Sequence, residues 1–410
     1  MNAGRSAEPR PSGAPREGEP EVQAPKALLM LLAGAAGLGA ANLYYGQPLA
    51  AAIGESLRAP PAAIGTALTA TQIGYALGMI LLVPLGDARE RRSLIVTTVA
   101  FAVPALLLVA VSGSVPALVA SSLLVGASSS VAQMIVPYSV DLAPAAERGK
   151  VVGTVMAGLL GGILLSRTAS GALGAALGWR AVYVVAAAAM ATLGVVLRLA
   201  IPAKQPSERL EYTAVLRSLA TVIATEPVLR TRALVGACGF ASFSVFWAML
   251  SYHLATFGHG SATAGLFGAV GIVGVLVAPV AGRLATGPRP ERLNVGSLVA
   301  TAASFAVFLL GARSLVAIGA GVVLLDAGVQ ANQLTNQTVI YGLEPELRSR
   351  LNAVYMVAYF IGGSAGTVAS SVAWSRGGWP AVCATGAAFA LLGLVPLALE
   401  RRRAPGQGQG

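Results

Sequence analysis

The sequence predicts an all-α membrane protein in which twelve transmembrane helices form two six-helix bundles. Three observations lead to this fold: the composition, the number and length of the apolar segments, and an internal repeat. Of the 410 residues, 55% are hydrophobic and 11% are charged, whereas a soluble globular chain contains about 25% charged residues. A soluble multidomain enzyme is close to excluded, because so few charged side chains cannot cover its surface.

Twelve apolar segments have the roughly 20 residues that a helix needs to cross a membrane. They are longer than β-strands and show no period-two alternation, which argues against a β-barrel. The first could serve as a signal peptide, but its length and the segments after it favour a retained helix. The predicted spans are 27–48, 62–85, 93–112, 115–140, 151–173, 179–200, 232–256, 262–285, 293–312, 314–340, 351–373 and 379–399.

Polar segments flank and divide these spans. Residues 1–26 are rich in Pro, Gly, Glu and Arg, and such a segment buries too little apolar surface to fold, so we expect a disordered cytoplasmic tail. Apolar residues at roughly helical spacing within 201–231 predict a cytoplasmic linker with an amphipathic helix. The amino-terminal bundle is then 27–200, the carboxy-terminal bundle is 232–399, and 400–410 is a second cytoplasmic tail.

The basic residues predict the orientation in the membrane. The chain carries 28 Lys and Arg and a net charge of +11. If the amino terminus is cytoplasmic, most of them fall on that side, which is the positive-inside pattern. This pattern places both termini in the cytoplasm and explains the basic charge without a nucleic-acid partner. Many Gly and Ala residues are typical of a high-GC bacterial genome, so we expect a multi-pass protein of the bacterial inner membrane. The four basic residues on the opposite side are Arg58, Arg180, Arg313 and Arg376.

An internal repeat appears at an offset of 200 residues. It implies two halves of six spans with the same topology, related by a pseudo-twofold axis along the membrane normal, with a substrate site between them. Chance similarity between Gly/Ala-rich helices is the alternative, but one offset shared by separate segments argues against it. The matching pairs are Gln133 and Gln333, Arg148 and Arg348, Gly162 and Gly362, Gly178 and Gly378, and Trp179 and Trp379.

A charged turn follows the second span. Asp87 ends that helix, and Arg89, Arg91 and Arg92 follow it. A stop-transfer cluster would explain this pattern. Alternatively, a carboxylate at a helix end can bind a neighbouring helix amino terminus and a basic side chain. We interpret Asp87, Arg91 and Arg92 as a gating latch that stabilises the outward-facing state.

This turn resembles the loop Gly-x-Leu-Ala-Asp-Arg-x-Gly-Arg-Arg/Lys of the major facilitator superfamily, with matches at Leu85, Asp87, Arg91 and Arg92. The stretches 41–49, 69–78, 147–156 and 348–356 are similar to its drug:proton-antiporter branch, which includes sugar- and nucleoside-efflux permeases. The resemblance covers about residues 27–400 and implies secondary transport by alternating access. Two features depart from that branch: Ser122 replaces an arginine of helix 4, and the helix 5 stretch 158–162 lacks a proline.

One predicted span carries an unusual polar face. Asp326, Gln330, Gln333 and Gln337 are spaced at i, i+4, i+7 and i+11, which places them on one side of a helix. Such a face could line a hydrated cavity or pack against another helix through amide hydrogen bonds. Burial disfavours the charged form of Asp326, so it could carry the coupled proton, or it could be a structural acid.

Further polar residues fall in spans that line the central cavity of the resembled family, where helices 1, 4, 7 and 10 surround the substrate. The resemblance therefore implies a substrate site that includes Gln330, Gln333 and Gln337 together with Asn42, Tyr45, Gln133, Trp247 and Asn336. Aromatic side chains there can stack on amphipathic ligands. Arg167 could form an ion pair with Asp326, bind an anionic substrate group, or extend to the outer headgroups.

The remaining signals restrict the function class. No phosphate-binding loop and no catalytic or metal-binding cluster is found, so we expect neither an enzyme nor a cofactor. The expected function is proton-coupled efflux of a small organic solute or drug by a monomer in the lipid bilayer. Proton symport, facilitated diffusion and a non-transporting sensor are the alternatives.

Overall fold

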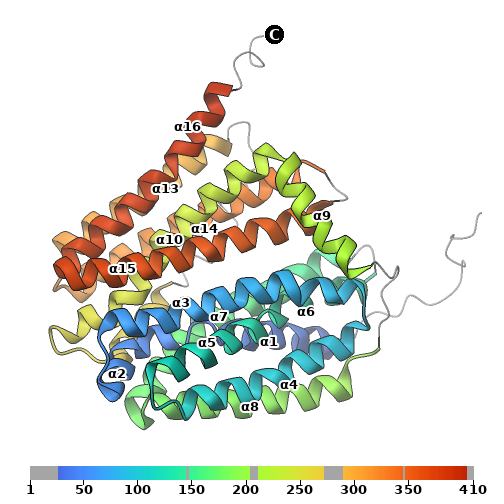
Figure 1. The fold of residues 1–410 in the computed structure, drawn as a ribbon, viewed down its shortest axis with the longest axis horizontal. Helices are drawn as coiled ribbons and strands as arrows, with labels where there is room; N and C mark the ends of the chain where they lie inside the picture. Colours follow the sequence, from blue (N-terminus) through green and yellow to red (C-terminus); the bar gives the residue numbers. More distant parts are fainter. Residues whose placement is uncertain (1–25, 145–146, 204–210, 272–289, 345–346, 404–410) are drawn as a thin grey trace, which may run out of the picture.

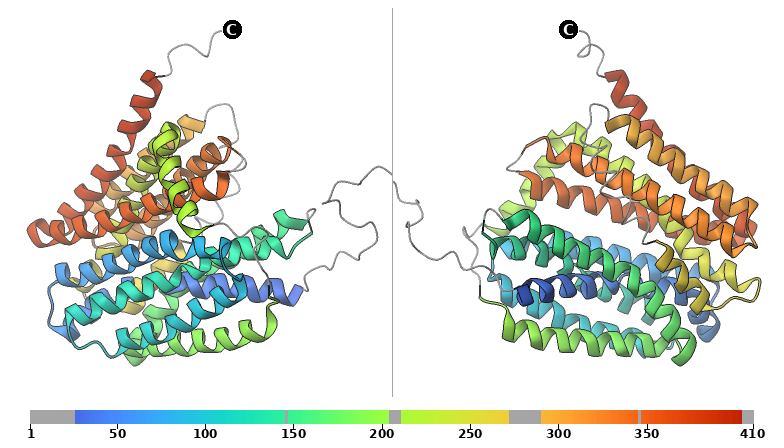
Figure 2. Two further views of the ribbon diagram at one scale, coloured as in Figure 1. Left: turned by 45° about the vertical axis from the view of Figure 1, so that its right-hand side comes forward. Right: turned by 180° about the vertical axis from the view of Figure 1, so that it is seen from behind.

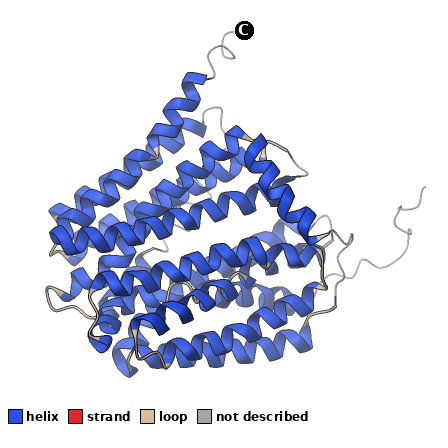
Figure 3. Ribbon diagram, in the orientation of Figure 1, coloured by secondary structure: helices blue, strands red, loops and turns tan. Residues whose placement is uncertain are grey.

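The computed structural model describes residues 26–144, 147–203, 211–271, 290–344 and 347–403, with only the backbone for Asp87 and for 401–403. Within these ranges, every regular element is a helix (Figure 3). The predicted tail 1–26 lies almost entirely outside them.

The helices form two layers that correspond to the two halves of the chain (Figures 1 and 2). The amino-terminal half contains α1 (Lys26–Ala41), α2 (Gly46–Leu57), α3 (Pro61–Leu81), η1 (Val83–Asp87), α4 (Arg91–Ala110), α5 (Val115–Ser129), α6 (Val131–Asp141), α7 (Arg148–Leu177) and α8 (Trp179–Ala200). After α9 (Tyr212–Thr225), the carboxy-terminal half contains α10 (Pro227–Ala255), α11 (Ser261–Val270), α13 (Pro290–Leu310), α14 (Leu315–Tyr341), α15 (Arg348–Leu392) and α16 (Leu394–Arg403).

Ten helical stretches in the described part are long and apolar enough to cross a membrane. The longest, Arg348–Glu400, contains two predicted spans, because the backbone is non-helical at Gly377 and Gly378. The predicted span 262–285 is described only as far as residue 271, where α11 ends. The fold predicted from the sequence, twelve helices in two related bundles, is confirmed.

The repeat is visible in the backbone as well as in the sequence. Four described residues have positive φ, and they form two pairs separated by 200 positions: Arg58 with Gly258, and Gly178 with Gly378. Glycine adopts this conformation readily, whereas a residue with a Cβ atom is strained in it. The two halves therefore turn in the same way at corresponding helix ends.

Small residues allow the longest helices of each half to pack closely. Gly158 and Gly162 of α7 contact the backbone of α1, at Ala33 and Gly37 respectively. In the other half, Gly362 and Gly366 of α15 contact the backbone of α10, at Ala237 and Ala241. This is the small-residue packing that lets membrane helices approach each other.

Two ends of the molecule differ in charge and in packing. We define the arginine-rich end as the one that carries Arg91, Arg92, Arg348 and Arg350; α9 lies along it (Figure 1). At the opposite end the two halves are in contact. There the Tyr252 hydroxyl donates a 2.9 Å hydrogen bond to a backbone carbonyl of α2. Nearby, the Thr168 hydroxyl of α7 donates a 3.0 Å bond to a carbonyl of α11.

Candidate functional site

A cavity of about 380 Å³ lies between the two halves. Its walls come from α1, α3, α6 and α7 on one side and from α10, α14 and α15 on the other. A second cavity of about 810 Å³ shares four lining residues with it and extends to the arginine-rich end. The shared residues are Val136, Val152, Tyr341 and Asn352. The two cavities together form a path from the arginine-rich end to the centre, while at the opposite end the described residues of the two halves are in contact.

The polar face of α14 points into this cavity. Asp326, Gln330, Gln333 and Gln337 all line it. Gln333 accepts a 3.2 Å hydrogen bond from Tyr359 of α15, and Gln337 donates a 3.2 Å bond to Asn352. The face therefore both lines the cavity and pairs with its neighbour, so the two interpretations of the sequence pattern hold together.

Gln133 supplies the equivalent amide from the amino-terminal half. It lines the cavity and donates a 3.0 Å hydrogen bond to the Tyr75 hydroxyl. Its repeat partner Gln333 also pairs with a tyrosine of its own half. The two halves thus present a similar amide–tyrosine pair to the same space.

Arg167 lines the cavity near its contact with α11, far from the arginine-rich end, and is 1% exposed. Its Nε donates a 2.8 Å hydrogen bond to Gln47, and its Nη2 has no hydrogen-bond partner. The guanidinium lies 4.1 Å from the ring centroid of Trp247 and 4.6 Å from that of Tyr44, which are cation–π distances. In this structure the side chain points between the halves and does not extend to the headgroups.

Asp326 faces the same space from α14 and is 5% exposed. The positive charge of Arg167 acts on its carboxylate, but these two described side chains form no direct ion pair. The Oδ1 atom of Asp326 and the indole Nε1 of Trp247 are both buried and make no hydrogen bond of standard geometry, but the indole N–H lies near enough to the carboxylate to stabilise its charge. Buried polar atoms are normally paired, so this is a place where a bound group can be stabilised.

Four predicted contacts lie away from the cavity lining. Trp247 is buried behind Arg167, and Tyr45 packs edge-on against Tyr183 within the amino-terminal half. Asn42 lines a separate small void in that half, and both of its amide atoms lack a partner. Asn336 is fully buried between α13 and α14.

Asn336 belongs to a hydrogen-bonded asparagine triad. Asn294 of α13 donates a 2.7 Å bond to Asn336, Asn336 donates a 3.2 Å bond to Asn332, and Asn332 donates a 3.2 Å bond to Asn294. Each of the three buried amides donates one hydrogen bond within the triad and accepts one. The triad therefore has the helix-packing role that amide groups have inside membranes.

The structure adds cavity residues that the sequence analysis did not select. Tyr44, Asn352 and Tyr359 line the cavity, and Gln47 orients Arg167. Asn352 and Tyr359 are seven residues apart on α15 with Met356 between them, which is the helical spacing that marked α14. The same spacing in the sequence could therefore have identified Asn352 and Tyr359 as cavity residues.

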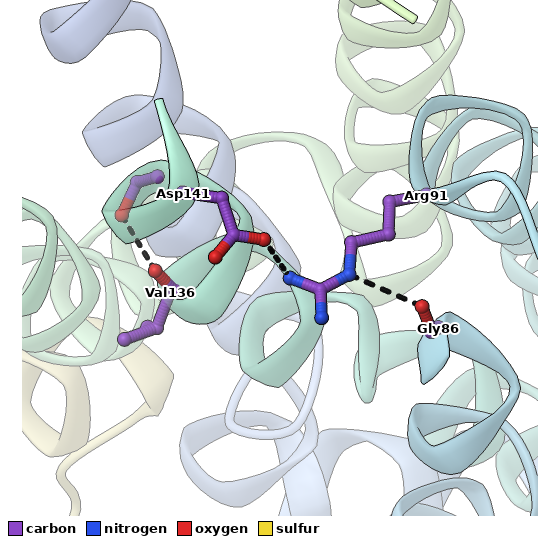
Figure 4. A network of polar contacts seen from close by, with 5 residues as sticks. Gly86, Arg91, Val136 and Asp141 are labelled. Carbon is purple, nitrogen blue, oxygen red and sulfur yellow. Dashed lines mark hydrogen bonds and ion pairs between the residues drawn. The ribbon is translucent and has the colours of Figure 1, made fainter. Parts of the chain in front are cut away.

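The predicted gating residues lie at the arginine-rich end. Arg91 forms an ion pair with Asp141 and donates a 3.1 Å hydrogen bond to the carbonyl of Gly86 (Figure 4). Arg92 donates to the backbone carbonyl of Arg198. The side chain of Asp87 lies outside the described part of the structure. Both arginines connect elements of the amino-terminal half, and the gating role stays a prediction.

Similarity to known proteins agrees with this architecture. The sequence model of the Major Facilitator Superfamily matches residues 29–367. The chain belongs to the major facilitator superfamily. A protein of Escherichia coli K12 that is named as an uncharacterized transporter, YgaY, is 40% identical over 379 residues, which cover 92% of this chain and 96% of YgaY. The transporter SCO4007 of Streptomyces coelicolor is 32% identical over 388 residues, which cover 94% of this chain and 90% of that protein. The chain is thus a membrane transporter and not an enzyme.

Two solved structures share the fold. A bacterial homologue of the human lysosomal transporter Spinster, in an inward-facing and occupied conformation, has a TM-score of 0.74 at 16% identity, covering 92% of this chain and 97% of that one. A point mutant of the nucleoside transporter NupG has a TM-score of 0.75 at 13% identity, covering 92% of this chain and 100% of that one. At such identities the likeness shows the fold alone.

Proposed function

We propose that this transporter exchanges protons for a small organic solute by alternating access and so exports the solute from a bacterial cytoplasm. The observation that carries the proposal is the position of Asp326, a buried carboxylate with an unpartnered oxygen at the cavity between the halves. Because protons flow inward down their gradient, exchange with them moves the solute outward.

The surroundings of Asp326 support a proton-binding role. A charged group within a membrane costs several kcal/mol unless it is paired or hydrated. Arg167 offsets part of this cost through its charge, but it does not contact the carboxylate directly. Protonation is the other way to remove the cost, so Asp326 has two accessible states. A change between them is what coupling requires.

The cavity supports a small solute with polar groups. Its volume of about 380 Å³ is near the lower end of the roughly 300–1,000 Å³ of small-molecule sites. Gln133, Gln330, Gln333 and Gln337 supply amide donors and acceptors along its wall. The positive-inside rule supports a cytoplasmic location for the arginine-rich end, and with that orientation the proposed state is inward-facing. Asp87, Arg91 and Arg92 are the proposed gate at that end.

Transport in liposomes tests the proposal. The protein is reconstituted with an internal pH-sensitive dye, and solute gradients are imposed from a panel of drugs, sugars and nucleosides. Asp326→Asn keeps the shape of the side chain but cannot bind the proton, so solute-driven proton movement is expected to disappear. Glu55→Gln makes the same chemical change at an exposed acid at the end of α2 and should leave the proton movement unchanged.

Facilitated diffusion is the second candidate, and the charge of Arg167 beside Asp326 favours it. In that case the carboxylate only neutralises the guanidinium. Solute flux without proton movement, equal in the wild type and in Asp326→Asn, would establish it and refute exchange. Proton movement in the same direction as the solute would instead indicate symport.

A further inference from the structure

The central cavity presents two opposite charges that do not satisfy each other. Arg167 comes from the amino-terminal half and Asp326 from the carboxy-terminal half, and both line the cavity. Each is more than nine-tenths buried, and each retains a polar atom without a hydrogen bond of standard geometry, Nη2 on Arg167 and Oδ1 on Asp326. The nearby indole of Trp247 stabilises the Asp326 carboxylate only in part. A solute that carries one group for each of these atoms would complete the site.

The charges of Arg167 and Asp326 restrict the class of solute that can exchange with a proton at this site. A simple cation would bind ionised Asp326 but would be repelled by Arg167. A simple anion would bind Arg167 best when Asp326 is protonated, so anion and proton would move together, contrary to exchange. A zwitterion has an ammonium group that competes with the proton for Asp326 and a carboxylate that pairs with Arg167.

The other walls of the cavity favour an aromatic or apolar side group beside those two charges. Tyr44, Phe240, Phe243, Tyr359 and Phe360 line it. Phe240 stacks on Tyr359 with ring centroids 4.1 Å apart, and it also packs against Phe243 at 5.4 Å. Aromatic rings contribute large apolar surfaces with defined geometry, so a flat or apolar group can be held beside the charged end.

We propose that this transporter binds a zwitterionic, amino-acid-like solute whose carboxylate pairs with Arg167 and whose ammonium group pairs with Asp326. This inference rests on the proposed proton exchange and names the substrate class of that same site. The titratable groups that act on Asp326 are the guanidinium of Arg167 on α7 and the hydroxyl of Tyr359 on α15, and Tyr44 acts on Arg167. One proton leaves Asp326 for each zwitterion bound, and no covalent step is involved.

A matched series of probes tests the substrate class independently of transport. Phenylalanine carries both charges, phenethylamine only the ammonium group, and 3-phenylpropanoate only the carboxylate. Binding to the purified full-length protein is measured by calorimetry in two buffers of different ionisation enthalpy, which counts the protons released. Phenylalanine should bind about tenfold or more tightly than either analogue, because each analogue leaves one buried charge unpaired, and it should release a proton.

Two variants assign the contacts. In Arg167→Gln, phenylalanine should bind no better than phenethylamine, and in Asp326→Asn it should bind no better than 3-phenylpropanoate and should release no proton. Thermal unfolding checks that each variant is folded, and Arg167→Lys, which keeps the charge, should retain a preference for phenylalanine if Arg167→Gln does not fold.

Other outcomes overturn the inference. Tighter binding of 3-phenylpropanoate with proton uptake would identify an anion site, and tighter binding of phenethylamine would identify a cation site. Binding of none of the three at millimolar concentration also refutes a zwitterion site. If a non-zwitterionic solute of the liposome panel then drives proton movement through Asp326, only the substrate class is wrong. If neither phenylalanine nor any solute of the panel moves protons, the proposed exchange itself fails.

Discussion

Adjacent glycines on α7 give a sharp test of the helix packing. A Cβ atom at Gly162 would meet backbone atoms of Gly37 closer than any real Cβ contact, whereas a Cβ atom at Gly161 has nothing within 4 Å. Overfilling a packed contact costs about 1–3 kcal/mol, while Gly→Ala in a helix gains about 0.5–1 kcal/mol. The net effect of these two terms is a loss of up to about 2.5 kcal/mol of stability for Gly162→Ala, whereas Gly161→Ala should gain about 0.5–1 kcal/mol.

Thermal unfolding of the purified protein in detergent measures this difference. Because unfolding of large proteins is often irreversible, the variants are compared at one heating rate, and the order of the midpoints is the readout. Both α1 and α7 belong to the same half, so the effect should not depend on the conformational state. A midpoint of Gly162→Ala at or above that of the wild type would refute the close packing, as would an equal loss in Gly161→Ala.

Two more predictions concern the closed end and the asparagine triad. Gly171→Ala inserts a Cβ atom against the backbone of α11, which disfavours the closed end by about 1–3 kcal/mol. Alkylation of Gln330→Cys from that end should therefore become about fivefold faster or more, whereas Gly153→Ala on the same helix, which has open space, should leave the rate unchanged. Asn294→Ala leaves two buried amides without their partner and should lower stability by about 1–3 kcal/mol, seen as a lower thermal midpoint; an unchanged midpoint would contradict the triad.

The fold was predictable from composition and segment length, because lipid restricts spanning segments to a few solutions. The predicted span 179–200 coincides with α8. The break within the first span was missed: α1 ends at Ala41 and α2 begins at Gly46. Pro48 was the available signal, since it falls in the first turn of α2, where proline is tolerated.

That same break affects the residues expected at the substrate site from the first span. Asn42 and Tyr45 are expected there from the sequence, but both lie in the turn between Ala41 and Gly46. In this turn Tyr44, and not Tyr45, lines the cavity. On α14, which is continuous, the helical period correctly groups four of the five residues that line the cavity; the fifth is Tyr341.

Periodicity alone could not separate Asn336 from Gln337, because neighbouring residues on a helix point about 100° apart and both are polar. The distinction depends on Asn294, a residue of another helix that pairs with Asn336. The role of Arg167 likewise depends on Gln47 and on aromatic rings from distant parts of the chain. Contacts of this kind have no local signal in a single sequence.

The backbone is repeated in the two halves, but the charges of Arg167 and Asp326 are not. The paired turns at Gly178 and Gly378 give the two halves the same frame, yet the repeat positions of Arg167 and Asp326 are Thr367 and Gly126, which are uncharged. The two halves of the backbone are therefore related by a pseudo-twofold axis, whereas the charges are not. Arg167 makes the amino-terminal side of the cavity positive, and Asp326 makes the carboxy-terminal side negative. Under the proposed alternating access, a zwitterionic solute would lie across this axis in only one sense, with its carboxylate toward the amino-terminal half and its ammonium group toward the other half. Under the proposed proton exchange, protonation of Asp326 would remove the electrostatic attraction between Arg167 and Asp326 across the cavity, so the same event that couples the proton would also weaken the contact between the halves.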